Sequence, residues 1–492
     1  MSDPGPSTNL ADQPEDVLDS GEAGGKAIRG GALFTASYVF GLLLSLVSAP
    51  FMIRHLGVVE YGQYVAVSAI VFIIGGFTEA GLTNLGIREY SSLRPEEREP
   101  FLRDLVGLRL VLTTIGVLVA IAITAATGSP DVVVAGVAVA GLGLLVQLTQ
   151  QTYAVPLNAQ LRMGWISILG IIRQGTLSAL FIGLVLLNAG LIAFFWASVV
   201  TGVVLVAVTV ALIRGTAPLL PGFHAESWKR ILRDTLPYAL AAAVGLIYFR
   251  IAVVLMSYVA TEEETGIFSA AFRIVEVVGV LPWMLVSAGF PILARAARDD
   301  EARLGYALQK MFEVANVLGA FIAMGLAIAA PFAIEVVAGK GFYASVSVLR
   351  LQSCGLLTSF LMVTWTYALV SLRLYRPLLL ANALAAVTAI VATLVLAPPL
   401  GAEGAAIATV AAEAALAAGA LWGLRSARPA LTPSLAVVPK VVVCLAAGVG
   451  VSALLPVGSL VQSFAAGAVY AALAFALRAV PPEAIAALRR KA

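Results

Sequence analysis

Long apolar runs separated by short polar segments dominate this chain. A membrane-spanning helix needs about 20 predominantly apolar residues, and about fourteen runs of suitable length occur. They lie at residues 30–53, 61–84, 105–127, 131–155, 164–187, 190–213, 235–258, 266–291, 311–338, 346–371, 377–397, 402–424, 436–455 and 459–478. The pattern predicts an all-α polytopic membrane protein with about 14 transmembrane helices.

Composition agrees with a bilayer as the main solvent. The chain is 60% hydrophobic and 12% charged, whereas soluble proteins are about 45–50% apolar and about 25% charged. Residues 1–25 differ, because they contain six acidic residues, three prolines and no basic residue. This composition predicts a disordered, acidic cytoplasmic tail.

Lysine and arginine are distributed unevenly between the two sides of the predicted bundle. If the N-terminus starts in the cytoplasm, 25 of the 31 basic residues fall in the N-terminal tail and the even-numbered connections, and so on the inner side. Cytoplasmic loops are enriched in Lys and Arg, so both termini are predicted to be cytoplasmic. The six exceptions are Arg54 and Lys340 in outer connections, and Arg173, Arg250, Arg273 and Arg350 inside spans.

A short internal repeat relates the two halves of the chain. At a constant offset of 204 residues, Met52, Glu60, Gly62 and Tyr64 match Met256, Glu264, Gly266 and Phe268. The first segment bridges spans 1 and 2, and the second bridges spans 7 and 8. Because six is an even number of spans, the halves have the same orientation. We expect two parallel-repeat six-helix lobes followed by two additional C-terminal helices.

These patterns divide the chain into five segments. After the acidic tail of residues 1–25 come an N-lobe at 26–218, a cytoplasmic amphipathic linker at 219–234, a C-lobe at 235–424, and residues 425–492, which contain the last two spans and a basic cytoplasmic tail. The linker contains Trp228 and three basic residues. It is typical of a helix that lies on the membrane surface against anionic lipid.

Four short motifs lie in and around the first two spans: Arg54-His55-Leu56-Gly57, Tyr61-Gly62-Gln63-Tyr64, Gly81-Leu82 and Arg88-Glu89. Together they resemble the opening of the bacterial polysaccharide flippases, which export O-antigen and capsule repeat units. These belong to the multidrug/oligosaccharidyl-lipid/polysaccharide exporter superfamily. The motifs cover only spans 1 and 2, whereas length, span number and half-repeat agree over the whole chain.

The resemblance implies two lobes around a central cavity and alternating access. It implies transport of an undecaprenyl-pyrophosphate-linked oligosaccharide from the inner to the outer leaflet of the bacterial cytoplasmic membrane. The lipid-linked oligosaccharide and membrane lipids would be its partners, with a polysaccharide polymerase as a further candidate. A cation-coupled multidrug exporter and a peptidoglycan-precursor flippase remain alternatives, because these proteins share the fold.

Arginines inside spans are the main candidates for binding a pyrophosphate, because each costs roughly 2.5–3.5 kcal/mol at mid-membrane on insertion scales. Arg250 lies in span 7 and Arg273 in span 8, where Glu276 follows on the same helix face. The three residues predict either a pyrophosphate-binding or gating cluster, or a buried structural ion pair. Arg173 in span 5 lines the cavity or extends to the inner headgroups.

Further candidates lie in the first two spans. Arg54 and Arg88 bracket span 2 and would act as substrate contacts or interfacial anchors. Tyr38 belongs to a polar stripe on span 1 that would stack on sugars or pack against a neighbouring helix. Glu79 and Glu276 are candidates for proton or Na⁺ coupling, or are partners of nearby arginines.

Several function classes lack support. The chain has two histidines, no G-x-x-x-x-G-K-[ST] motif and no basic stripe with interleaved aromatics. A histidine-based metal site, an ATP-driven pump and nucleic-acid binding are therefore not expected. Very short outer loops leave no room for the acidic residues of an intramembrane glycosyltransferase. We expect a transporter rather than an enzyme, with no cofactor.

Overall fold

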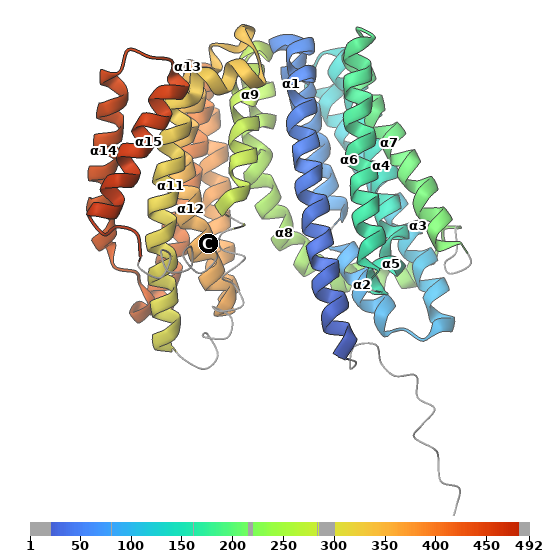
Figure 1. Ribbon diagram of the computed structural model, residues 1–492. Helices are drawn as coiled ribbons and strands as arrows, with labels where there is room; N and C mark the ends of the chain where they lie inside the picture. The colour runs from blue at the N-terminus through green and yellow to red at the C-terminus, as the bar shows by residue number, and fades with distance from the viewer. Residues whose placement is uncertain are drawn as a thin grey trace, which may run out of the picture.

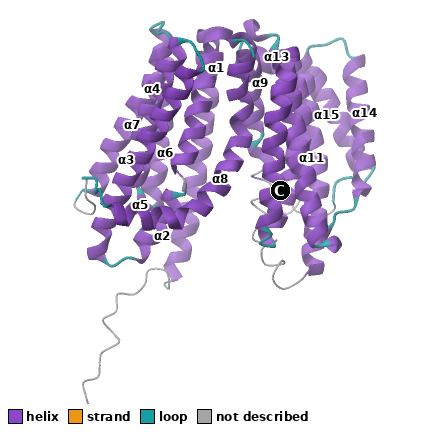
Figure 2. Cartoon of the chain, turned by 180° about the vertical axis from the view of Figure 1, so that it is seen from behind, coloured by secondary structure: helices purple, strands orange, loops and turns teal. Residues whose placement is uncertain are grey.

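A computed structural model describes residues 21–79, 81–160, 162–214, 220–282, 284 and 301–481, within which every long element is a helix (Figure 2). In chain order the helices are α1 (Gly21–Glu79), α2 (Leu82–Ser92), α3 (Pro95–Ala126), α4 (Asp131–Tyr153), α5 (Val155–Ala159), α6 (Met163–Leu186), α7 (Leu191–Ile213), α8 (Ala225–Val259), α9 (Glu262–Val278), α11 (Glu301–Val337), α12 (Ser345–Ser371), α13 (Tyr375–Ala427), α14 (Val438–Leu454) and α15 (Ser459–Ala476).

Eleven helices within the described residues are long and apolar enough to cross a membrane. Two of them, α1 and α13, are 59 and 53 residues long and kinked, so each supplies two of the predicted spans. The seventh span lies in α8, and residues 285–291 of the eighth lie outside the described residues. The chain is therefore a multi-pass all-α membrane protein with about the predicted number of spans.

Each of the two long helices, α1 and α13, is kinked at a glycine. Gly57 in α1 has φ 69° and ψ −176°, and Gly401 in α13 has φ 57° and ψ −135°. A side chain disfavours this left-handed region, whereas glycine enters it freely. Both kinks lie at one end of the bundle, which we call the outer end, following the orientation predicted from the charges.

The bundle has two lobes (Figure 1). Helices α1 to α7 form one side, α11 to α15 form the other, and α8 and α9 run between them. The last two helices pack on α11, where the Tyr470 hydroxyl donates to the Val317 carbonyl at 2.9 Å and the Ser463 hydroxyl donates to the Gly325 carbonyl at 2.9 Å. They are thus an addition to the flank of the C-lobe.

The repeat detected in the sequence corresponds to a reciprocal contact between the lobes. A Cβ atom on Gly62 would overlap the Glu262 carbonyl, and one on Gly266 would overlap the Val58 carbonyl. Residues 58 and 262, like 62 and 266, are 204 positions apart. The contact between Gly62 and Glu262 is thus repeated between their counterparts, Gly266 and Val58. Such a reciprocal pair of contacts is the signature of two-fold symmetry. The outer end is therefore close to the axis that relates the lobes.

Buried apolar side chains distinguish the outer end from the inner end. The largest cluster unites both lobes and includes Ile53 and Met256 with Phe342. Clusters nearer the inner end belong to one lobe or the other, such as the cluster around Leu105 in the N-lobe and that around Leu424 in the C-lobe. The lobes therefore share a core at the outer end and separate below it.

The predicted linker is attached to the N-lobe. The Gly222 amide donates to the Arg103 carbonyl at 2.7 Å, and the Trp228 indole donates to the Asp104 carbonyl at 2.9 Å. From Ala225 onward, the linker and predicted span 7 form one continuous helix, α8. Residues 1–20 of the acidic tail and residues 482–492 of the basic tail lie outside the described residues.

Candidate functional site

A polar cavity lies between the lobes. It consists of two adjoining pockets of about 300 and 340 Å³, formed by α1, α6, α8 and α9, and we call it the interlobe cavity. The pockets share Ser45, Gln174, Arg273 and Glu276 as lining residues. This position, below the shared outer core, suits a site that alternating access would expose to one side at a time.

Two arginines and one glutamate form a cation cluster on this cavity. One carboxylate oxygen of Glu276 accepts from Arg250, and the other accepts from Arg273 at 2.9 Å. The Arg273–Glu276 pair follows from the i, i+3 spacing on α9, whereas Arg250 comes from α8. The three side chains are 17–34% exposed. The cluster contains two guanidinium groups and one carboxylate, so one positive charge is in excess.

Both arginines of the cation cluster contact the N-lobe. Arg273 donates to the Ser45 hydroxyl of α1 at 2.8 Å. The guanidinium carbon of Arg250 lies 5.1 Å from the ring centre of Phe72 in α1 and 5.6 Å from that of Phe272 in α9. Desolvated cation–π contacts of this kind are worth about 2 kcal/mol or more. An anion that binds these arginines would therefore also act on a contact between the lobes.

Two further predicted residues line the interlobe cavity. Arg173 of α6 and Tyr38 of α1 both border the 340 Å³ pocket, next to Arg273. Tyr38 is 53% exposed, and within the described part of the chain Arg173 has no hydrogen-bond or ion-pair partner. The cavity therefore combines a cation cluster, a further guanidinium and an accessible aromatic ring.

The structure places the other two predicted arginines elsewhere. Arg54, at the outer end of the first half of α1, donates to the carbonyls of Glu335 at 2.9 Å and Val336 at the end of α11. Arg88, on α2, is paired with its neighbour Glu89 at 2.8 Å and is 69% exposed. Neither arginine lines the interlobe cavity.

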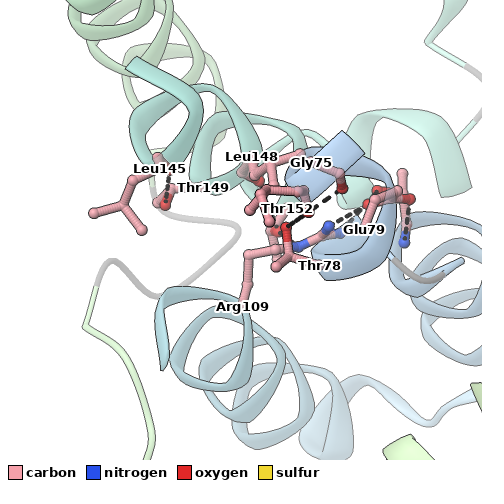
Figure 3. Close-up of polar contacts among 10 residues, drawn as sticks. Gly75, Thr78, Glu79, Arg109, Leu145, Leu148, Thr149 and Thr152 are labelled. Carbon is pink, nitrogen blue, oxygen red and sulfur yellow. Dashed lines mark hydrogen bonds and ion pairs between the residues drawn. The ribbon is translucent and has the colours of Figure 1, made fainter. Parts of the chain in front are cut away.

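Glu79 belongs to a second charged network, inside the N-lobe (Figure 3). Its carboxylate pairs with Arg109 of α3 and accepts from the Thr83 hydroxyl at 3.1 Å. Arg109 also donates to the hydroxyls of Thr83 at 2.9 Å and Thr152 at 3.2 Å. The Arg109 side chain is 0% exposed, and this network, which we call the N-lobe ion pair, is electrically neutral.

Sequence reasoning missed the role of Arg109, because it was counted with the inner-side basic residues. Its position inside the predicted span 105–127 was the available signal. Glu413 of α13 differs from Glu79. Its carboxylate accepts from Ser359 at 2.7 Å and Thr358 at 3.3 Å, and among the described residues no basic side chain pairs with it. The described residues contain no group of three or more His, Cys, Asp or Glu able to hold a metal ion.

Comparison with solved structures identifies the fold. The lipid II flippase MurJ, in an inward closed conformation, aligns with a TM-score of 0.73 and 15% identity, covering 91% of this chain and 99% of that chain. An inward-facing multidrug resistance MATE family transporter of the MOP superfamily aligns with a TM-score of 0.63 and 16% identity, covering 79% and 95%. At these identities the similarity shows the fold alone.

Sequence comparison identifies the family. No curated protein matches the chain. The family described as polysaccharide biosynthesis protein matches residues 27–297, which is more than half of the chain. This match includes the N-lobe from residue 27 onward, α8, α9 and therefore the complete cation cluster. The chain thus belongs to the polysaccharide biosynthesis protein family and has the two-lobed fold of the MOP superfamily flippases and transporters.

Proposed function

We propose that this protein is a flippase that moves an undecaprenyl-pyrophosphate-linked oligosaccharide from the inner to the outer leaflet by alternating access. The observation that carries the proposal is the cation cluster on the interlobe cavity, with its excess positive charge. Arginine offers a fork of donors that matches phosphate oxygens. A pyrophosphate would therefore find both charge and geometry in this cavity, while the polyprenyl tail stays in the lipid.

The same residues offer a route from binding to movement. Arg250 and Arg273 contact Phe72 and Ser45 of the N-lobe. A pyrophosphate that takes over these donors weakens the contact between lobes that share a core only at the outer end. A ligand shifts a conformational equilibrium only through such differential contacts. Binding at the cation cluster would therefore favour rearrangement of the lobes.

The two alternative substrates differ in how well they fit. A cation-coupled drug exporter would be expected to present acidic side chains to a cationic drug, whereas this cavity has a positive excess. A peptidoglycan precursor carries the same polyprenyl pyrophosphate, so the cation cluster suits it equally. Rescue of a strain that lacks its lipid II flippase would favour the precursor, and rescue of a repeat-unit flippase mutant would favour the oligosaccharide.

The decisive experiment removes the cationic side chains. Export of lipid-linked glycan should be abolished in Arg250→Ala and Arg273→Ala, while both variants still insert and accumulate. Arg→Lys at either position should rescue partly, because lysine keeps the charge but loses the bidentate fork. Arg88→Ala, which removes an exposed arginine outside the cavity, is the matched control. Normal surface glycan in the double alanine variant would refute the binding role.

Location and orientation are part of the proposal. The distribution of Lys and Arg supports the bacterial cytoplasmic membrane with both termini inside. In that orientation the outer end, where the lobes share a core, faces away from the cytoplasm. A polysaccharide polymerase that consumes the flipped oligosaccharide would act on that side.

A further inference from the structure

Helix α4 carries two glutamines that packing within the lobe does not use. Gln147 and Gln151 are one turn apart and border a cavity of about 430 Å³ inside the N-lobe, the N-lobe cavity. Within the described part of the chain, neither amide has a hydrogen-bond partner. Gln150, on another face of the same helix, is buried and donates to the Thr209 hydroxyl at 2.9 Å. Of the three glutamines in this span, Gln150 is therefore bonded within the lobe, whereas the amides of Gln147 and Gln151 can bond to a ligand in the cavity.

Free amides at membrane depth need a compensating partner. An amide removed from water without a hydrogen bond costs roughly 2–7 kcal/mol. Gln147 and Gln151 lie on one helix face, because residues four apart are neighbours. Together they present two donor groups and two acceptor groups to the same space.

Aromatic side chains also line the N-lobe cavity. The rings of Tyr64 and Phe195 stack with centroids 5.4 Å apart and an angle of 14° between planes. Phe181 meets Tyr64 edge to face at 6.3 Å. An aromatic face is electron-rich and attracts the C–H groups of a ligand placed on it. A cavity lined by both amides and aromatic side chains fits a molecule with hydroxyl groups at its edge and C–H groups on its faces.

The N-lobe cavity adjoins the interlobe cavity. Tyr64, Ser68, Leu177 and Phe181 line both the 430 Å³ cavity and the 300 Å³ pocket that contains Arg250 and Arg273. A group attached directly to a pyrophosphate at the cation cluster would therefore lie beside the N-lobe cavity. The volume is within the range of about 300–1,000 Å³ typical of ligand pockets.

We propose that the N-lobe cavity is the saccharide subsite, where Gln147 and Gln151 bind sugar hydroxyls and the aromatic side chains of the lining pack against the C–H groups of a sugar ring. The inference rests on the proposed function, because it orients the substrate with its pyrophosphate at the cation cluster. At the inner end of this cavity, the Glu79 carboxylate, held by Arg109, offers a further acceptor. The subsite gives selectivity for the sugar, while the cation cluster supplies affinity for the charge.

A binding experiment separates the two sites. The full-length protein in lipid nanodiscs is titrated with undecaprenyl pyrophosphate, and with the same lipid carrying N-acetylglucosamine or galactose. The wild type should bind at least one sugar-bearing lipid about tenfold more tightly than the bare lipid, which corresponds to about 1.4 kcal/mol. The Gln147→Leu/Gln151→Leu variant should lose this preference and still bind the bare lipid, which also shows that it is folded.

Gln150→Leu is the matched control, because it changes the same residue type on a face away from the cavity; it should keep the preference for sugar. An unchanged preference in the Gln147→Leu/Gln151→Leu variant, or a wild type that binds all three lipids equally, would overturn the saccharide subsite. Failure of the wild type to bind undecaprenyl pyrophosphate, with or without sugar, would instead overturn the proposed function.

Discussion

Two charged networks inside the bundle use the same residue types in different proportions. The N-lobe ion pair joins one arginine, Arg109, to one glutamate, Glu79, and its guanidinium is 0% exposed. The cation cluster joins Arg250 and Arg273 to the single carboxylate of Glu276, and its side chains are 17–34% exposed to a cavity. The first network is electrically balanced and its guanidinium is buried, although Glu79 is 30% exposed at the N-lobe cavity. The second network has an excess positive charge, and both of its guanidiniums are partly exposed.

The difference separates a charge whose partners within the protein balance it from one whose partners do not. Burying a charge is tolerated when it is paired and hydrogen-bonded, and both conditions hold for Arg109, which also donates to two threonine hydroxyls. The cation cluster keeps an excess positive charge, which local packing does not require. An anionic ligand in the cavity would balance this excess positive charge, which would explain why the charge lies there.

Breaking the balanced network should have the largest effect on the protein itself. Arg109→Ala removes a side chain that is 0% exposed, leaves a void in its place and leaves the Glu79 carboxylate without its cation. Removing one partner of a buried pair costs about 3–5 kcal/mol of stability, and the void adds to this cost. We expect its level in membranes to fall more than tenfold, measured by immunoblot of a tagged protein. The Arg109→Leu/Glu79→Gln variant should restore most of that level. An abundant Arg109→Ala protein that fails to transport would contradict a structural role.

Changing the carboxylate of the cation cluster should have a smaller effect. Glu276→Gln removes the carboxylate that pairs with both guanidiniums, which are 17% and 34% exposed. We therefore expect a several-fold loss of abundance, corresponding to about 1–2 kcal/mol. Glu276→Gln/Arg273→Gln returns the excess to one positive charge and should restore abundance without restoring export. Both quantities are measured in the same cells.

The opposite outcome for Glu276→Gln would assign the carboxylate a different role. If Glu276 carries a coupling proton, the single variant should accumulate normally and bind substrate. Its transport would then no longer respond to the proton gradient. We favour the ion pair, because the Glu276 carboxylate accepts hydrogen bonds from both Arg250 and Arg273.

The smallest effects are expected at the arginines outside both networks. Arg54→Cys and Arg88→Cys, made in a chain that also carries Cys354→Ala and Cys444→Ala, should accumulate near the normal level. In intact cells a membrane-impermeant maleimide should label Arg54→Cys and leave Arg88→Cys unlabelled. Labelling of the second variant alone would reverse the proposed orientation of the bundle.

Some of the site follows from local spacing and some does not. The Arg273–Glu276 contact is an i, i+3 pair on one helix and could be predicted from the sequence. The approach of Arg250 to the same carboxylate depends on how α8 lies against α9. Arg54 was equally conspicuous in the sequence, because it breaks the charge asymmetry, yet it caps the end of α11 rather than lining the cavity.

The sequence by itself determined the class of protein, the positions of the spans and the 204-residue repeat, because these depend on hydrophobicity and spacing along one chain. Only the tertiary structure decided which intramembrane charges share a partner, that Gly62 meets its repeat counterpart Gly266, and that Gln147 and Gln151 face a cavity while Gln150 does not. The reason is physical. A helix satisfies its own backbone locally, whereas a polar side chain inside a membrane is satisfied by whichever neighbouring helix packs against it.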